Sequence, residues 1–354
     1  MADPAVQKFI LKILMSLPSP VLRAMSGGGS VYRGGRTLDP RFQFLAAAAA
    51  KMPSMPCLAP DQARAASAQG LAAMSGPSEP GVRTENLSID GPGGTPLKLR
   101  AYRPADQDSG APMIVFAHFG GGVIGDLETC HAFCGILART CRTAVLSVDY
   151  RLAPDHRFPA GLDDVLAAYR WGRDNAARFG ALPGTAAIGG DSMGGNFAAI
   201  VAQEMKRLGE AQPALQLLIY PAVDVASETP SMTTYSDAYP LSRPIMDWFM
   251  GHYMGADADP ADPRLSPNKT QDLSGLAPAV VVTAGFDPLV DQGEAYAKRL
   301  IAAGVPTTYR CYDSLAHGFT AFTGAIPAAD AACREIARLV RAGFEASSPL
   351  SSRA

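Results

Sequence analysis

The feature that most constrains the fold is a series of short, nearly continuous apolar runs, separated by stretches long enough to form a helix. Continuous runs of this length indicate strands buried on both faces, and their alternation with helices predicts a mostly parallel sheet with right-handed crossovers. With the two β-rich runs that flank the turn Gly91-Pro92-Gly93-Gly94, about eight strands are expected. The predicted strands are Asn86–Ile89, Leu97–Tyr102, Met113–Ala117, Ala144–Val148, Ala186–Ile188, Leu217–Tyr220, Ala279–Thr283 and Thr307–Tyr312.

Two segments interrupt the alternation of strands and helices, and they divide the chain. Residues 1–80 have no clear strand pattern; a helix is predicted to open there at Asp39-Pro40. The apolar residues between Val6 and Leu17 have helical spacing, which predicts an amphipathic helix docked by that face, with Lys8 and Lys12 opposite. Residues 223–276 exceed one crossover helix and predict a lid inserted between the sheet segments 81–222 and 277–354.

Composition limits the partners and the compartment. Charged residues make up 18% of the chain and the formal net charge is −2, which argues against a nucleic-acid surface and fits a small, nearly neutral substrate. The six cysteines form no Cys-x-x-Cys pair, so we expect them to be reduced and the protein to be cytoplasmic. No apolar run approaches the ~20 residues that span a bilayer, and we expect no stable membrane insertion.

A candidate nucleophile lies in the turn Gly190-Asp191-Ser192-Met193-Gly194. The turn follows the predicted strand at Ala186–Ile188 and precedes a helical pattern over Phe197–Met205, and a tight strand-to-helix turn of this kind can hold a serine exposed. Alone, a Gly-x-Ser-x-Gly match is a weak signal in a chain with 35 glycines. The strand and helix around it favour Ser192 as the nucleophile.

A serine nucleophile needs a base and an orienting acid, which follow it in the order Ser, Asp, His in this kind of fold. Only His252 and His317 lie beyond Ser192; we favour His317, in a loop after the last predicted strand, since His252 lies in a helical part of the lid. Asp287 and Asp224 both follow strands. We favour Asp287 as the acid, with Asp224 and then Asp291 as alternatives.

The glycines of His118-Phe119-Gly120-Gly121-Gly122 follow a predicted strand and can supply backbone N–H groups for an oxyanion, together with the amide of Met193. The same region also matches a dinucleotide fingerprint, Gly120-x-Gly122-x-x-Gly125, with Asp149 ending the next strand. An NAD(P)-dependent oxidoreductase would leave the serine, aspartate and histidine unexplained. The other alternative is a small-molecule receptor on a hydrolase fold that binds without turnover.

Several motifs together resemble the hormone-sensitive-lipase-like esterases, bacterial family IV of the α/β-hydrolase fold, over most of residues 39–320. The motifs are His118-Phe119-Gly120-Gly121-Gly122-Val123-Ile124-Gly125-Asp126, Asp149-Tyr150-Arg151-Leu152-Ala153-Pro154, Gly190-Asp191-Ser192-Met193-Gly194-Gly195-Asn196, Asp287-Pro288-Leu289 and His317-Gly318-Phe319. The resemblance implies a Ser192-Asp287-His317 triad, a cap built from the N-terminal helices and the insertion, and short-chain acyl esters as substrates.

The resemblance also implies oxyanion donors at Gly120 and Gly121, with Gly122 in reserve, and it implies neither a metal nor a cofactor. Phe119 stands where the family has its first motif glycine, Gly122 stands at its aromatic position, and Met193 replaces a common alanine. We therefore expect Phe119 and Gly122 to shape the substrate pocket. A homodimer paired along the predicted edge strand Thr307–Tyr312 is also expected.

Overall fold

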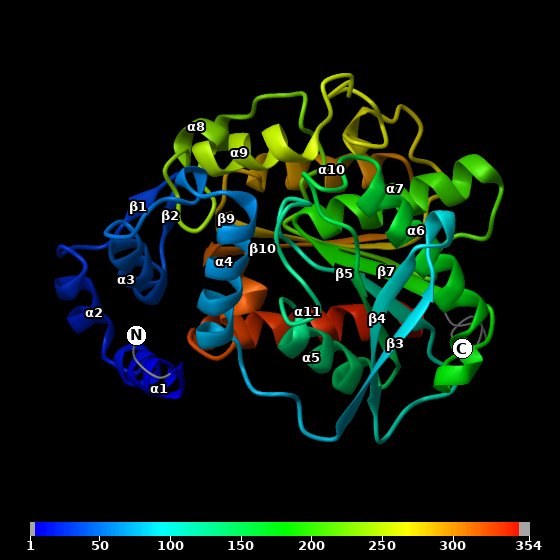
Figure 1. Ribbon diagram of the computed structural model, residues 1–354, viewed down its shortest axis with the longest axis horizontal. Coiled ribbons are helices and arrows are strands. Elements are labelled where there is room, and N and C mark those ends of the chain that lie inside the picture. The colour runs from blue at the N-terminus through cyan, green and yellow to red at the C-terminus, as the bar shows by residue number, and fades with distance from the viewer. Residues whose placement is uncertain (1–3, 347–354) are drawn as a thin grey trace.

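The computed structural model describes residues 4–346, which are built around one eight-stranded sheet with the order β10-β9-β8-β7-β5-β6-β4-β3 (Figure 1). Strand β4 runs antiparallel to both of its neighbours, β3 and β6, and the remaining pairs are parallel. The predicted mostly parallel sheet is thus confirmed. The strands are β3 Val82–Asp90, β4 Pro96–Pro104, β5 Met113–Ala117, β6 Val145–Asp149, β7 Ala186–Asp191, β8 Gln216–Ile219, β9 Ala279–Phe286 and β10 Thr307–Ala316.

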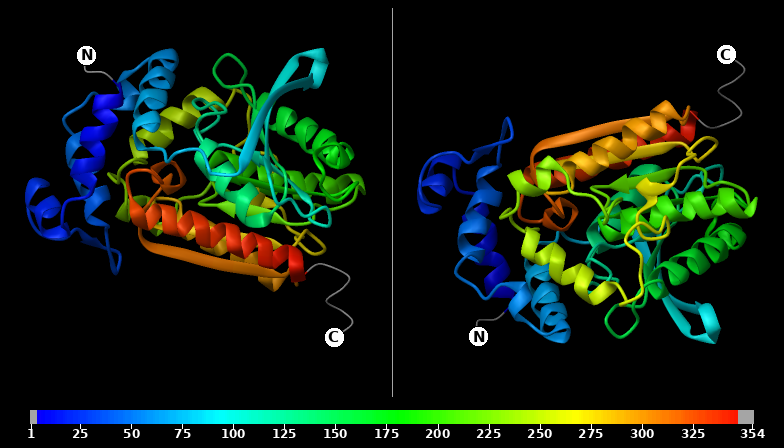
Figure 2. Two further views of the ribbon diagram at one scale, coloured as in Figure 1. Left: turned by 90° about the horizontal axis from the view of Figure 1, so that it is seen from below. Right: turned by 90° about the horizontal axis from the view of Figure 1, so that it is seen from above.

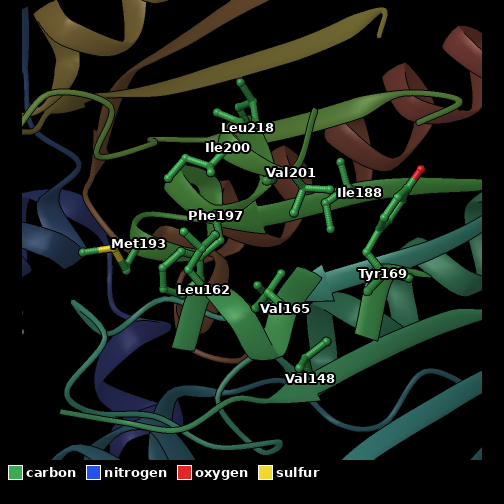
Figure 3. Packing of buried hydrophobic residues seen from close by; sticks show 14 of the residues in the cluster. Val148, Leu162, Val165, Tyr169, Ile188, Met193, Phe197, Ile200, Val201 and Leu218 are labelled. Carbon is green, nitrogen blue, oxygen red and sulfur yellow. The ribbon is translucent and has the colours of Figure 1, made fainter. Parts of the chain in front are cut away.

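Helices cover both faces of the sheet. Helices α5 (His131–Cys141) and α11 (Pro327–Ala346) pack on one face, while α6 (Ala160–Asp174), α7 (Met193–Leu208) and α10 (Val290–Ala302) pack on the other (Figure 1). Figure 3 shows the second layer, where Phe197 of α7 lies beside Leu162 of α6; both belong to the apolar cluster that also contains Ile188 of β7. Complete burial of the central strands explains why they read as continuous apolar runs.

The chain between β8 and β9 forms a lid of short helices. It contains α8 (Pro230–Thr234), α9 (Arg243–Tyr253) and the 3₁₀ turn η4 (Pro267–Lys269). Helix α9 lies directly on the loop that follows β5, because a Cβ added to Gly121 would come within 2.3 Å of Phe249 on α9. The remaining 3₁₀ turns are η1 Met55–Cys57, η2 Pro92–Gly94, η3 Ala176–Phe179 and η5 Phe319–Phe322.

An N-terminal layer, residues 4–74, stands at one end of the molecule and is drawn in blue in Figures 1 and 2. Asp39 caps a helix as predicted, since its carboxylate accepts the N–H of Arg41 at 2.7 Å. A two-stranded hairpin, which the sequence did not predict, turns at Gly34 and Gly35 with φ of 56° and 77°. Strands of two residues are too short to show alternation. The layer contains α1 Pro4–Met15, α2 Ser19–Met25, β1 Tyr32–Arg33, β2 Arg36–Thr37, α3 Pro40–Ala49 and α4 Pro60–Met74.

Helix α1 docks by a face that overlaps only in part with the one the sequence predicted. Phe9, Ile10 and Ile13 are 65%, 50% and 49% exposed, whereas Leu11, Met15 and, from the predicted face, Leu14 pack against the protein. The prediction was wrong for Phe9, Ile10 and Ile13 because Leu11 and Met15 are also one turn apart, so α1 has two apolar faces and only tertiary packing selects between them. Within residues 4–346, no helix combines the length and apolar character needed to cross a bilayer.

Candidate active site

Ser192 lies between β7 and α7 in a backbone conformation that a serine rarely adopts, with φ of 56° and ψ of −115°. The turn is possible because its neighbours have no side chain: a Cβ on Gly194 would lie 2.0 Å from the carbonyl oxygen of Ala117, and one on Gly190 would lie 2.2 Å from Gly194. The Ser192 N–H donates to the carbonyl of Ile219 at 2.8 Å. These contacts fix a strained turn that raises the serine above the sheet edge.

The structure brings Ser192, His317 and Asp287 together. His317 follows β10, and its Nε2 lies 2.9 Å from Ser192 Oγ. Its Nδ1 lies 2.7 Å from Asp287 Oδ2, and the other carboxylate oxygen of Asp287 accepts the N–H of Leu289 at 2.8 Å. All three side chains are buried, although Ser192 keeps 8% of its surface exposed. The distances suit proton transfer from the hydroxyl to the imidazole, with the carboxylate orienting the ring.

The alternative acids and the other histidine have different partners. Asp224 accepts backbone N–H groups two and three residues ahead and pairs with Lys269 at 3.2 Å. Asp291 accepts the N–H of Ser231 at 2.8 Å, which ties α8 to the start of α10. His252 lies on α9 with its ring against Trp248, at 4.6 Å between ring centroids. The structure places none of the three next to His317.

The loop after β5 supplies the backbone that was expected to hold an oxyanion. Gly120, Gly121 and Gly122 have φ of 127°, 61° and 73°, a region that L-residues with side chains rarely adopt. Met193 is the first residue of α7, so its N–H has no acceptor within the helix and lies at the positive end of the helix dipole. Helix α5 begins only at His131, so no helix opens at these glycines as a dinucleotide site requires.

Residues outside the glycine motif hold this loop in place. The His118 Nδ1–H donates to the Phe119 carbonyl at 2.7 Å, and the imidazole stacks on Tyr150 with ring centroids 4.3 Å apart. Burial lowers the pKa of His118 to about 4, so the ring is neutral at pH 7. Arg64 of α4 donates to the carbonyls of Val123 and Ala153 at 2.9 and 2.8 Å. No pattern in the sequence near Arg64 predicts this contact between distant segments.

A small cavity opens beside Ser192. Its accessible volume is about 100 Å³, and Gly121 and Met193 line it next to the serine. Ion pairs from Arg243 to Glu228 and to Asp247 stand at its rim. The apolar side chains of its wall are Met193, Ala222, Val225, Met232, Leu241, Met246, Phe249, Met250 and Leu289.

Phe119 and Gly122, the two residues predicted to shape the pocket, are not among the residues that line this cavity. Phe119 is half-buried and packs against the apolar cluster on the α5 face of the sheet. Gly122 lies under α9, where a Cβ would come within 2.5 Å of the Tyr253 ring. Their influence on substrates stays a prediction, and the walls of this cavity come mainly from the lid.

A second buried carboxylate lies under the histidine, at Asp191. Its Oδ2 accepts the hydroxyls of Tyr220 at 2.9 Å and Thr320 at 2.6 Å, and Cys130 Sγ lies 3.5 Å from Oδ1. The Tyr220 ring in turn contacts the His317 ring, with centroids 4.7 Å apart. Burial raises the pKa of Asp191 to about 6. Sequence reasoning left Asp191 outside the site, although its position at the end of a buried strand was a usable signal.

Comparison with known proteins identifies relatives of this arrangement. The family model described as alpha/beta hydrolase fold matches residues 114–321. The "Carboxylic ester hydrolase LipN" of Mycobacterium tuberculosis is 43% identical, and the matched region covers 87% of this chain and 84% of that protein. The "Ethyl acetate hydrolase" of Pseudomonas putida is 36% identical over 80% of this chain and 90% of its own length.

A solved structure has the same architecture. An ester hydrolase from the metagenome of Lake Arreo, determined with a derivative of bipyridine phosphonate, superposes with a TM-score of 0.83. It is 40% identical in sequence, and the match covers 87% of this chain and 99% of that chain. The likeness therefore extends over nearly the whole length of the solved enzyme.

Proposed function

Because this chain belongs to the hormone-sensitive-lipase-like esterases of the α/β-hydrolase fold and is a carboxylesterase, we propose that it cleaves short-chain acyl esters through a triad of Ser192, His317 and Asp287. The observation that carries the proposal is the unbroken series of contacts from Ser192 Oγ through the imidazole to the Asp287 carboxylate, at 2.9 and 2.7 Å. Asp287 holds the ring in the tautomer that leaves Nε2 free to accept a proton.

In the proposed acylation step, Ser192 Oγ attacks the ester carbonyl while its proton moves to His317 Nε2. The negative charge that develops on the carbonyl oxygen is held by the N–H groups of Gly120, Gly121 and Met193. The imidazolium then gives its proton to the departing alcohol, and an acyl-serine remains. The buried Asp287 stabilises the imidazolium in this interval.

In the proposed deacylation step, His317 takes a proton from a water molecule, whose oxygen attacks the acyl-serine carbonyl. The same three N–H groups hold the second oxyanion, and the proton returns from the imidazolium to Ser192 Oγ as the carboxylic acid leaves. All proton transfers in this cycle pass through one nitrogen atom, Nε2 of His317.

Two observations support short acyl chains. The cavity beside Ser192 is small, at about 100 Å³, and the bulky side chains of Met193 and Phe249 line it. A relative 36% identical to this chain carries the name "Ethyl acetate hydrolase".

A series of p-nitrophenyl esters from acetate to palmitate tests this proposal, with kcat/KM as the readout. We expect the highest values between acetate and hexanoate, and Ser192→Ala as the control should abolish turnover of every member. A maximum at palmitate would contradict the short-chain assignment while leaving the triad untouched.

A further inference from the structure

Most of the exposed large apolar side chains that the structure describes lie in the N-terminal layer. Among residues 8–346, ten such side chains are strongly exposed, and seven of them lie between residues 9 and 52. Scattered single apolar residues are normal on a protein surface, but a gathering within one structural layer indicates an interaction site. The seven residues are Phe9, Ile10, Ile13, Val21, Met25, Tyr32 and Met52.

The exposed side chains of α1 form a defined face. Phe9 and Ile13 are one turn apart, and Lys8 and Lys12 precede them by one residue each, so the two ammonium groups follow one border of the apolar stripe. Helix α2, at the same end of the molecule, exposes Val21 and Met25 with the same one-turn spacing (Figures 1 and 2). An apolar stripe bordered by lysines is typical of helices that lie in a membrane interface.

Charge in this part of the chain has one sign. Residues 4–38 contain five cationic side chains and no acidic one, although the formal net charge of the whole chain is −2. Arg33 and Arg36 pair with acidic residues of the main body, Asp237 and Asp313. The other three cations have no acidic partner among the residues that the structure describes. They are Lys8, Lys12 and Arg23.

We propose that the exposed face of α1 and α2 binds the surface of an anionic lipid bilayer. Phe9 and Ile13 of α1, together with Val21 and Met25 of α2, enter the headgroup boundary. Lys8 and Lys12 lie against lipid phosphates. The helices lie on the membrane and do not span it. A second copy of the chain fits this face poorly, because a two-fold interface would set the same unpaired cations against each other.

Contacts join the N-terminal layer, which carries the proposed membrane face, to the lid over the cavity. The hydroxyl of Tyr235, at the end of α8, donates to the carbonyl of Arg33 in the hairpin of this layer at 3.2 Å, and Arg33 also pairs with Asp237. The lid is therefore attached to the same layer that would lie on the bilayer. The proposal concerns location and holds whatever ester the enzyme prefers.

The test is co-sedimentation of the full-length protein with phosphatidylcholine vesicles that contain or lack phosphatidylserine. We expect binding to the phosphatidylserine vesicles that weakens as salt is raised. The double variant Phe9→Ser/Ile13→Ser should bind them at least about tenfold more weakly, and Lys8→Gln/Lys12→Gln should lose the preference for phosphatidylserine. The matched control Leu182→Ser/Leu208→Ser changes two exposed apolar residues outside the layer and should bind like the unaltered protein.

Two further readouts keep the proposal open to refutation. Thermal unfolding and hydrolysis of a water-soluble ester should be the same in all these variants, which separates lost binding from lost folding. Failure to sediment with phosphatidylserine vesicles would overturn the proposal. So would a dimer in solution that Phe9→Ser/Ile13→Ser converts to a monomer, because the face would then be an interface between copies.

Discussion

The central sheet and the N-terminal layer are both built from short apolar segments, yet they differ in how completely these segments are buried. Every residue of β5, β7 and β9 is buried, whereas α1 leaves Phe9, Ile10 and Ile13 exposed. A central strand is held by hydrogen bonds on both edges and covered by helices on both faces, so its burial follows from its position. A surface helix can dock in different rotations about its axis. Its apolar pattern predicts that one face is buried, but not which surface buries that face.

The largest expected effect tests whether catalysis depends on the main body of the protein and not on the N-terminal layer. Ser192→Ala should lower kcat on p-nitrophenyl acetate by at least ~10³-fold while the protein stays folded, because the variant loses the hydroxyl that lies 2.9 Å from His317 Nε2. Phe9→Ser, in the N-terminal layer, should change kcat less than about twofold on this soluble ester. Comparable losses in both variants would remove the functional distinction between the two regions.

The next effect distinguishes two buried acids of the main body. Asp287→Asn should lower kcat by ~10²-fold or more, since the amide cannot stabilise the imidazolium and favours the wrong tautomer of His317. Asp224→Asn should cost less than about tenfold, because Asp224 pairs with Lys269 and caps its own turn. Steady-state kinetics at pH 7 would measure both, and a larger loss in Asp224→Asn would reassign the acid.

A smaller loss is expected where the lid meets the oxyanion loop. A Cβ on Gly121 would lie 2.3 Å from Phe249, and the residue has φ of 61°, so Gly121→Ala should lower kcat/KM roughly 10²-fold by moving its N–H. Gly251→Ala is the matched control on α9 itself, because a Cβ there meets nothing within 4 Å. Unchanged kcat/KM in Gly121→Ala would show that its amide is not a donor.

The buried carboxyl group of Asp191 should make the stability of the folded protein depend on pH. Burial raises its folded-state pKa to about 6, above its value in the unfolded chain, so the folded protein binds this proton more tightly. The stability this group contributes is therefore full below the unfolded pKa and is lost as pH rises through about 6. Relative to the unaltered protein, Asp191→Asn should gain roughly 1 kcal/mol in the free energy of unfolding between pH 5 and pH 8. A difference that stays constant with pH, measured by urea denaturation, would contradict this.

The smallest effect belongs to the exposed face of α1. Phe9→Ser and Ile13→Ser should each change the free energy of unfolding by less than about 0.5 kcal/mol in the absence of lipid. Leu22→Ala, a fully buried position of α2, should cost roughly 2 kcal/mol or more and serves as the control within the layer. A loss of that size at Phe9 would mean that another part of the molecule covers α1 in solution.

Local sequence predicted the parts of the molecule in which a short segment determines its own surroundings. The eight strands are confirmed in order, and the glycines around Ser192 predicted the turn because no other residue fits their contacts. Strand-end positions limited the acids to a few candidates, and the structure places Asp287 beside His317.

The rest depends on contacts between distant segments, which no local pattern encodes. Arg64 reaches the oxyanion loop from another layer, and Tyr220 and Thr320 meet on Asp191 from separate elements. The prediction of the docked face of α1 was partly wrong for the same reason. The surface on which the helix lies selects one of its two apolar faces.

The packing of α9 on the glycine loop has a kinetic consequence. Phe249 and Tyr253 occupy the space that side chains at Gly121 and Gly122 would fill, and the carbonyl of Tyr253 accepts the N–H of Phe158 at 2.9 Å. Swinging α9 outward would remove the contact that shapes this loop, so we expect α9 to stay in place during turnover. Esters would then enter past the rim of the cavity, and the rate should saturate smoothly with substrate concentration, without a jump when the ester passes its solubility limit.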